Sequence, residues 1–190
     1  MPLRLHKISI LVVEDIVPMR QILVGVLEEF GVGKIYTADH GGEGFSQFQK
    51  HRPDIVITDW MMEPIDGLEM IKMIRTHPAS PNRLVPVILI SGYSALSRVT
   101  EARDMGVTEF LTKPFTGGDL AKRLAHIINK PRDFVEAGTF FGPDRRRRKS
   151  DQYEGRLRRR EEADFRKEDT PPAYGDDPKD KSGSWDIVIQ

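Results

Sequence analysis

The feature that most limits the fold of this chain is a series of five short apolar runs that alternate with helical patterns. Most of the runs are rich in β-branched residues, as buried strands are, and each is followed by a predicted helix, although the apolar pattern is weaker at 41–51 and the segment 94–105 is mostly polar. The runs are 8–13, 34–38, 54–58, 84–90 and 109–112, and the helical segments are 17–30, 41–51, 67–77, 94–105 and 116–129. Strict alternation predicts an α/β, doubly wound fold with a parallel sheet, right-handed crossovers and helices on both faces.

Polar side chains stand where four of these runs end. Glu14 and Asp15 follow the first run, Asp59 follows the third, Ser91 the fourth and Lys113 the fifth. Ligands of open α/β sheets bind outside the carboxyl ends of the strands. If the strands are adjacent and parallel, three carboxylates, a hydroxyl and an ammonium group converge at one edge of the sheet.

Three carboxylates in one pocket repel one another unless a cation neutralises them. Mg²⁺ prefers oxygen ligands and usually takes one or two protein carboxylates together with water and phosphate oxygens. We therefore expect Asp15 and Asp59 to be direct ligands and Glu14 to act through water. A backbone carbonyl near Met61 would complete the metal shell.

The same constellation suits phosphoryl transfer. A carboxylate such as Asp59 can act as a nucleophile and become an aspartyl phosphate. Mg²⁺ and Lys113 would neutralise the charge of the transferring group, and Ser91 would donate a hydrogen bond to a phosphate oxygen. Each residue also has a simpler alternative, since Glu14 and Asp15 can cap the following helix and Lys113 can be a surface residue.

Several function classes are excluded or disfavoured by what the sequence lacks. It contains no cysteine, so disulfides, zinc thiolate sites and thiol nucleophiles are excluded. Neither of the glycine-rich phosphate-binding motifs of nucleotide sites is present. No run approaches the roughly 18 apolar residues of a membrane span, and no secretory signal pattern follows the first residues. We expect a cytoplasmic protein without membrane association.

Taken together and in order, the motifs resemble the receiver domain of bacterial two-component response regulators of the chemotaxis-regulator type. The matching segments lie between about residue 7 and residue 130 and are L-V-V-E-D (11–15), D-W-M-M-E-P-I-D-G (59–67), I-S-G (90–92) and F-L-T-K-P-F (110–115). The resemblance implies a flavodoxin-like sheet in the order 2-1-3-4-5. It also implies Mg²⁺-dependent phosphorelay, in which a sensor histidine kinase or histidine phosphotransfer protein phosphorylates Asp59, followed by slow autodephosphorylation.

The resemblance further implies a switch and a signalling role, with no enzymatic turnover of an external substrate. Ser91 would move toward the phosphate and the ring of Phe110 would rotate inward, so that an output protein recognises the changed surface. Phe110 can equally be a plain core residue. The peptide between Lys113 and Pro114 is expected to be cis. Trp60 is expected to be a partly exposed aromatic residue of the loop beside the site.

Composition changes after residue 130, and the mean hydropathy of −0.44 indicates that a polar segment dilutes an ordinary core. We predict a receiver domain at 1–130 and a charged, mostly disordered extension at 131–190. Between Arg145 and Arg160 stand nine basic and two acidic residues. This stretch can be a solvated tail, or it can dock on an acidic protein, on nucleic acid or on the acidic site itself.

The alternative function is therefore a nucleic-acid-binding regulator that uses the Arg-rich tail. A third class, a phosphohydrolase with an aspartate nucleophile, is disfavoured. Such enzymes usually carry a second acid two residues after the nucleophile, where this chain has Met61.

Overall fold

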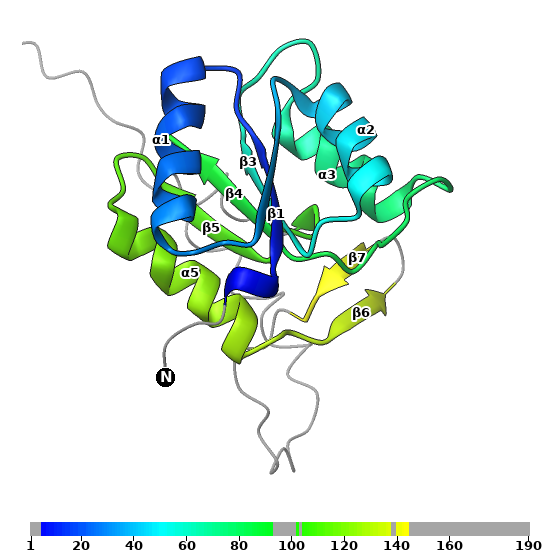
Figure 1. Ribbon diagram of the computed structural model, residues 1–190. Coiled ribbons are helices and arrows are strands. Elements are labelled where there is room, and N and C mark those ends of the chain that lie inside the picture. The colour runs from blue at the N-terminus through cyan, green and yellow to red at the C-terminus, as the bar shows by residue number, and fades with distance from the viewer. Residues whose placement is uncertain (1–4, 93–101, 103, 138–139, 145–190) are drawn as a thin grey trace, which may run out of the picture. The chain divides into compact units, whose positions relative to one another are not determined.

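The computed structural model describes residues 5–92, 102, 104–137 and 140–144, and its core is a five-stranded parallel sheet. The strands lie in the order β2-β1-β3-β4-β5, as expected. Their bounds are β1 Ser9–Val13, β2 Lys34–Ala38, β3 Ile55–Asp59, β4 Val87–Ser91 and β5 Glu109–Thr112. The predicted α/β, doubly wound, flavodoxin-like fold is thereby confirmed (Figure 1).

Helices cover both faces of the sheet. They are α1 Val17–Glu29, α2 Gly41–His51, α3 Gly67–Thr76 and α5 Gly117–Asn129, and a short 3-10 turn, Leu5–Lys7, precedes β1. Residues of α1 and α5 share one hydrophobic cluster, and residues of α2 and α3 share the other (Figure 1). The helix expected at 94–105 lies mostly outside the described residues. Among the described helices, none is long and apolar enough to cross a membrane.

Burial on both faces explains why the central strands read as continuous apolar runs. Every residue of β3 and β4 is buried. Val56 belongs to the cluster under α2 and α3, whereas its neighbour Ile57 belongs to the cluster under α1 and α5. A strand with both faces covered needs apolar side chains at successive positions. These central strands carry Asp59 and Ser91 at their carboxyl ends.

A two-stranded antiparallel sheet follows α5 and was not foreseen from the sequence. It consists of β6 Phe134–Ala137 and β7 Phe140–Pro143. The ring of Phe134 lies 5.1 Å from Cζ of Arg75, and the ring of Phe141 lies 4.1 Å from Cζ of Arg83. Part of the predicted disordered extension is therefore a hairpin that packs against the receiver, while the division at residue 130 stays a prediction.

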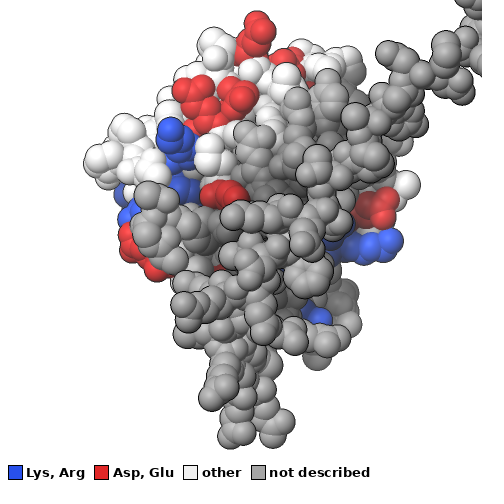
Figure 2. All heavy atoms as spheres, turned by 180° about the vertical axis from the view of Figure 1, so that it is seen from behind, with Lys and Arg blue, Asp and Glu red and all other residues white. Residues whose placement is uncertain are grey.

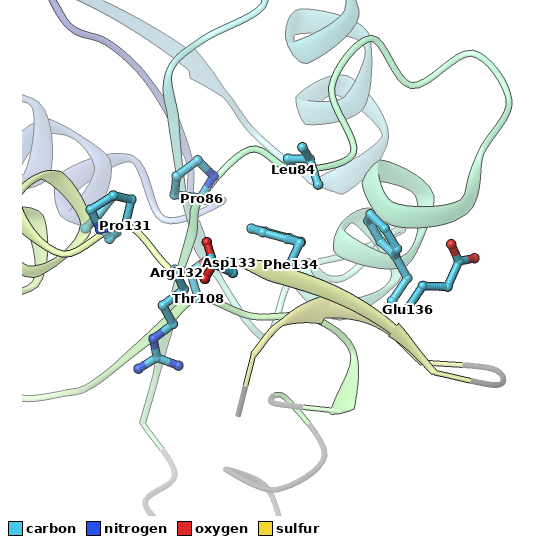
Figure 3. Close-up of a pocket in the computed structure, with 10 residues that line it drawn as sticks. Leu84, Pro86, Thr108, Pro131, Arg132, Asp133, Phe134 and Glu136 are labelled. Atoms are coloured by element: carbon cyan, nitrogen blue, oxygen red, sulfur yellow. The ribbon is translucent and has the colours of Figure 1, made fainter. Parts of the chain in front are cut away.

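The hairpin closes one side of a cavity of about 530 Å³. Figure 3 shows Phe134 beside this space, with Leu84 and Pro86 from the segment before β4 and Pro131 from the segment after α5. Residues far apart in the sequence thus meet where β4 begins, at the opposite end of that strand from Ser91.

Candidate functional site

Three acids meet at the carboxyl edge of the sheet, as the sequence predicted. Asp59 ends β3 and is only 7% exposed, while Glu14 directly follows β1 and is fully buried. Asp15, the next residue, is exposed to solvent. One carboxylate oxygen from each of the three lies within 4.8 Å of the others. The residue before α1, Ile16, has no side-chain cap, so the alternative role of Glu14 and Asp15 as helix caps is not observed.

Lys113 reaches into this acidic group from the end of β5. Its Nζ lies 2.7 Å from Oδ1 of Asp59 and 3.1 Å from Oε2 of Glu14. Its backbone N–H donates to the carbonyl oxygen of Ser91 at 2.7 Å, which ties the lysine to the end of β4. The simpler alternative of a solvated surface lysine is therefore not observed.

The pKa values of two site residues reflect this packing. Burial, reinforced by the charge of Asp59, raises the pKa of the Glu14 carboxyl above its ordinary value. Burial alone would lower the pKa of Lys113, but its close contacts with the carboxylates of Asp59 and Glu14 outweigh burial and raise that pKa. The lysine therefore stays protonated at neutral pH, and negative charge remains in excess around it.

The residues present fit a hard cation. Lys113 forms ion pairs with two of the three carboxylates, and its one positive charge does not balance the three. Oδ1 of Asp59 is buried and lies within ion-pair distance of Lys113, yet it accepts no aligned hydrogen bond from the described residues. A buried oxygen with spare acceptor capacity, beside two further acids, is the donor set that Mg²⁺ prefers.

The other predicted site residues occupy positions around the acids. Ser91 is buried at the end of β4, one residue beyond Ile90, the register partner of Asp59. Phe110 lies within β5 and packs, partly buried, against the cluster under α2 and α3. The side chain of Met61 is 56% exposed, and the metal role assigned to its backbone carbonyl stays a prediction.

Trp60 differs from its expected place. It was predicted to be a partly exposed loop residue, but it is only 4% exposed. Its backbone N–H donates to the carbonyl oxygen of Ile90 at 2.9 Å, so the pairing of β3 with β4 continues past Asp59. Its ring meets that of Phe110 edge to face, with centroids 6.4 Å apart. The residue after Asp59 therefore contacts the residue predicted as the switch aromatic.

Gly67 and the proline peptides complete the site loops. A Cβ atom at Gly67 would stand 2.0 Å from the carbonyl oxygen of Asp59, so only glycine fits there. From the sequence, residue 67 was predicted only as the start of a helix, and nothing in the pattern indicated this close approach. The predicted cis peptide between Lys113 and Pro114 is present, and the peptide between Glu63 and Pro64 is also cis.

An acid at the end of the central strand, joined to a lysine from the last strand of a 2-1-3-4-5 sheet, defines a receiver-type signalling domain. The response regulator receiver domain family matches residues 10–125, and the chain belongs to this family. It is accordingly a signalling protein of the phosphorelay type.

Named relatives agree with this assignment. The chain is 30% identical to chemotaxis protein CheY-3 of Vibrio cholerae over 124 residues, which are 65% of this chain and 94% of the relative. It is 30% identical to the chemotaxis protein CheY homolog of Campylobacter jejuni over 121 residues, which are 63% of this chain and 92% of the relative.

Solved structures show the same fold. A putative response regulator from Chloroflexus aurantiacus has a TM-score of 0.59 and 27% identity, covering 65% of this chain and 98% of the other. Chemotaxis response regulator CheY4 of Vibrio cholerae has a TM-score of 0.58 and 28% identity, covering 63% and 98%. Each match covers about two-thirds of this chain and almost the whole of the solved chain.

None of these findings supports the nucleic-acid alternative. The stretch Arg145–Arg160 on which it depends lies outside the described residues. On the part of the face in Figure 2 that the structure describes, acidic and basic side chains are interspersed and do not form one basic surface.

Proposed function

We propose that Asp59 accepts a phosphoryl group from a sensor histidine kinase or a histidine phosphotransfer protein, with Mg²⁺ as cofactor. The observation that carries the proposal is the placement of Asp59, a nearly buried carboxylate 2.7 Å from the ammonium group of Lys113 and grouped with two further acids. Membership of the receiver family supports the same role.

In the proposed transfer, a carboxylate oxygen of Asp59 attacks the phosphorus atom of a phosphohistidine. The phosphorus–nitrogen bond breaks, the imidazole leaves with the electron pair, and an acyl phosphate forms on Asp59. Lys113 then pairs with a phosphoryl oxygen in place of its present contact with the free carboxylate. Ser91, at the end of the neighbouring strand β4, is proposed to donate a hydrogen bond to another phosphoryl oxygen.

Mg²⁺ would neutralise the charge of the phosphoryl group. Asp15, Asp59 and the backbone carbonyl of Met61 would hold the metal directly, and Glu14 would hold it through water. Slow attack by water on the acyl phosphate returns the carboxylate and inorganic phosphate. This self-limited reaction is the only chemistry we assign, so the protein is proposed to signal and not to turn over external substrates.

Output is proposed to follow from a switch of Ser91 and Phe110. The edge-to-face contact between Trp60 and Phe110 gives a direct path from the residue after the phosphoacceptor to β5. A shift of that ring would alter the surface beside β5 that an output protein recognises. The domain division at 130 and the cytoplasmic location expected from the sequence remain predictions.

The test is uptake of radiolabelled phosphate from acetyl phosphate in the presence of Mg²⁺. Wild type should incorporate label, and chelation of the metal should prevent it. Asp59→Asn should incorporate none, whereas the control Glu63→Gln, an exposed acid of the same loop, should behave as wild type. Equal labelling of Asp59→Asn and wild type would show that another residue is the acceptor.

A further inference from the structure

Arg20, near the start of α1, contacts the acidic site without taking part in the proposed chemistry. Its Nη1 donates a hydrogen bond to the backbone carbonyl oxygen of Glu14 at 2.6 Å. The same nitrogen lies 2.8 Å from Oδ1 of Asp39, and the Arg20 side chain is only 16% exposed. A guanidinium group that is largely buried between a carbonyl and a carboxylate is held in one place.

The carbonyl that Arg20 binds belongs to the peptide joining Glu14 to Asp15. Because a peptide unit is planar, fixing its carbonyl also fixes the direction in which the next residue leaves it. The N-cap residue of α1, Ile16, supplies no side-chain cap, and its backbone N–H donates only a long hydrogen bond, 3.4 Å, to Oε1 of Glu14. The backbone N–H of Glu14 donates to the carbonyl oxygen of Ala38 at 3.2 Å. Arg20 therefore adds a side-chain bond to the opposite end of the same residue.

Asp39 anchors the arginine from the neighbouring loop. It directly follows β2, and its backbone N–H donates to Oε2 of Glu43, at the start of α2, at 2.8 Å. Arg20 thus joins the loop after β1 to the loop after β2. Both loops lie at the carboxyl edge of the sheet, where the acids gather.

We propose that Arg20 is a positioning residue of the metal site, which orients the Glu14–Asp15 peptide so that both carboxylates face Asp59. The inference rests on the proposed function, because it takes Mg²⁺ to bind among these three acids. Residues that orient metal ligands typically change metal affinity about 10- to 100-fold when replaced.

Charge and positioning predict opposite effects of removing Arg20. Loss of a positive charge beside an anionic site, by itself, strengthens the binding of a cation. Loss of the orienting hydrogen bond weakens it. In Arg20→Gln, weaker binding of Mg²⁺ therefore indicates a positioning role, and tighter binding indicates an effect of charge alone. Arg20→Lys keeps the charge but loses the planar group that directs one nitrogen to two acceptors.

The experiment is a Mg²⁺ titration of the full chain at constant ionic strength, followed by the fluorescence of Trp60, which adjoins Asp59. Trp185→Phe serves as the background so that a single tryptophan reports. The dissociation constant for Mg²⁺ should rise about 10-fold or more in Arg20→Gln and by less in Arg20→Lys. Arg52→Gln, which removes a charge near the opposite end of β3, should leave it unchanged.

The outcomes separate the inference from the function on which it rests. A saturable response of the background protein, with equal or tighter binding in Arg20→Gln, would overturn the positioning role alone. Absence of a saturable response in the background protein would overturn both. Circular dichroism and thermal unfolding without Mg²⁺ establish that each variant is folded at the titration temperature, so that loss of affinity is not loss of structure.

Discussion

Replacement of Phe134 by alanine should destabilise the receiver, although this residue lies beyond the last receiver motif. Its ring faces the guanidinium of Arg75, which is only 2% exposed. The N–H groups of that guanidinium donate to the carbonyl oxygens of Gly106 at 2.9 Å and Arg83 at 2.7 Å. Burial, together with the charge of Arg83, lowers the pKa of Arg75 to about 9, so it is still a cation at neutral pH.

The size of the effect follows from the contacts that would be lost. A cation over an aromatic ring at a desolvated site contributes about 2 kcal/mol. The contact of Phe134 with the ring of Phe141, at 5.9 Å between centroids, contributes about 1 kcal/mol more. The free energy of unfolding should therefore fall by about 3 kcal/mol. For a domain of this size, that lowers the melting temperature by about 10 °C.

Urea unfolding of the full chain, followed by circular dichroism, measures this change. Phe134→Ala should lower the midpoint and leave the slope with urea unchanged. Val135→Ala is the matched control, because the next residue of a strand points to the opposite face. A difference of less than about 0.5 kcal/mol between the two variants would refute the reasoning, since surface substitutions stay within that range. The face of the hairpin that meets Arg75 would then contribute no more to the stability of the receiver than the opposite face.

Three further predictions follow from the described contacts. Thr116→Ala removes the capping box of α5 and should lower the free energy of unfolding by about 1 kcal/mol in urea titrations. Hydrogen bonds from Thr116 lower the pKa of Asp119 to about 2, below its ordinary 3.8. The contribution of ionised Asp119 to the free energy of unfolding should thus be complete above about pH 4 and fade toward pH 2. In Asp119→Asn, the free energy of unfolding should lack this dependence on pH in the acid range. Lys113→Met should slow phosphoryl uptake from acetyl phosphate about 100-fold or more, while a loss under 10-fold would contradict its assigned role.

The sheet could be predicted from the sequence because its central strands are covered on both sides. The bounds predicted for β2, α2 and β5 agree with the structure, and those of β1, β3 and α3 differ by one residue. The fourth strand was predicted to begin at Leu84 but begins at Val87. Pro86 has no N–H for the ladder, and Leu84 is 52% exposed, so the apolar run there is longer than the strand.

The site was predictable in its chemistry but not in its supporting contacts. The acids and Lys113 could be placed because parallel strands bring their carboxyl ends to one edge. The burial of Trp60 could not be predicted, because nothing in the sequence indicates that strand pairing continues to the residue after Asp59. The hairpin was missed because Phe134 and Phe141 stand in a charged segment, and their partners Arg75 and Arg83 are distant in sequence.

The most direct test of the central claim is the chemical identification of the phosphorylated residue. Borohydride reduces an aspartyl phosphate to homoserine, which peptide mass spectrometry locates in the chain. After treatment with acetyl phosphate and Mg²⁺, followed by borohydride, Asp59 should be recovered as homoserine, and omission of Mg²⁺ should abolish the conversion. Reduction at Asp15 with Asp59 intact, or no reduced acid in a protein that has taken up phosphate, would contradict the assignment of Asp59 as the phosphoacceptor.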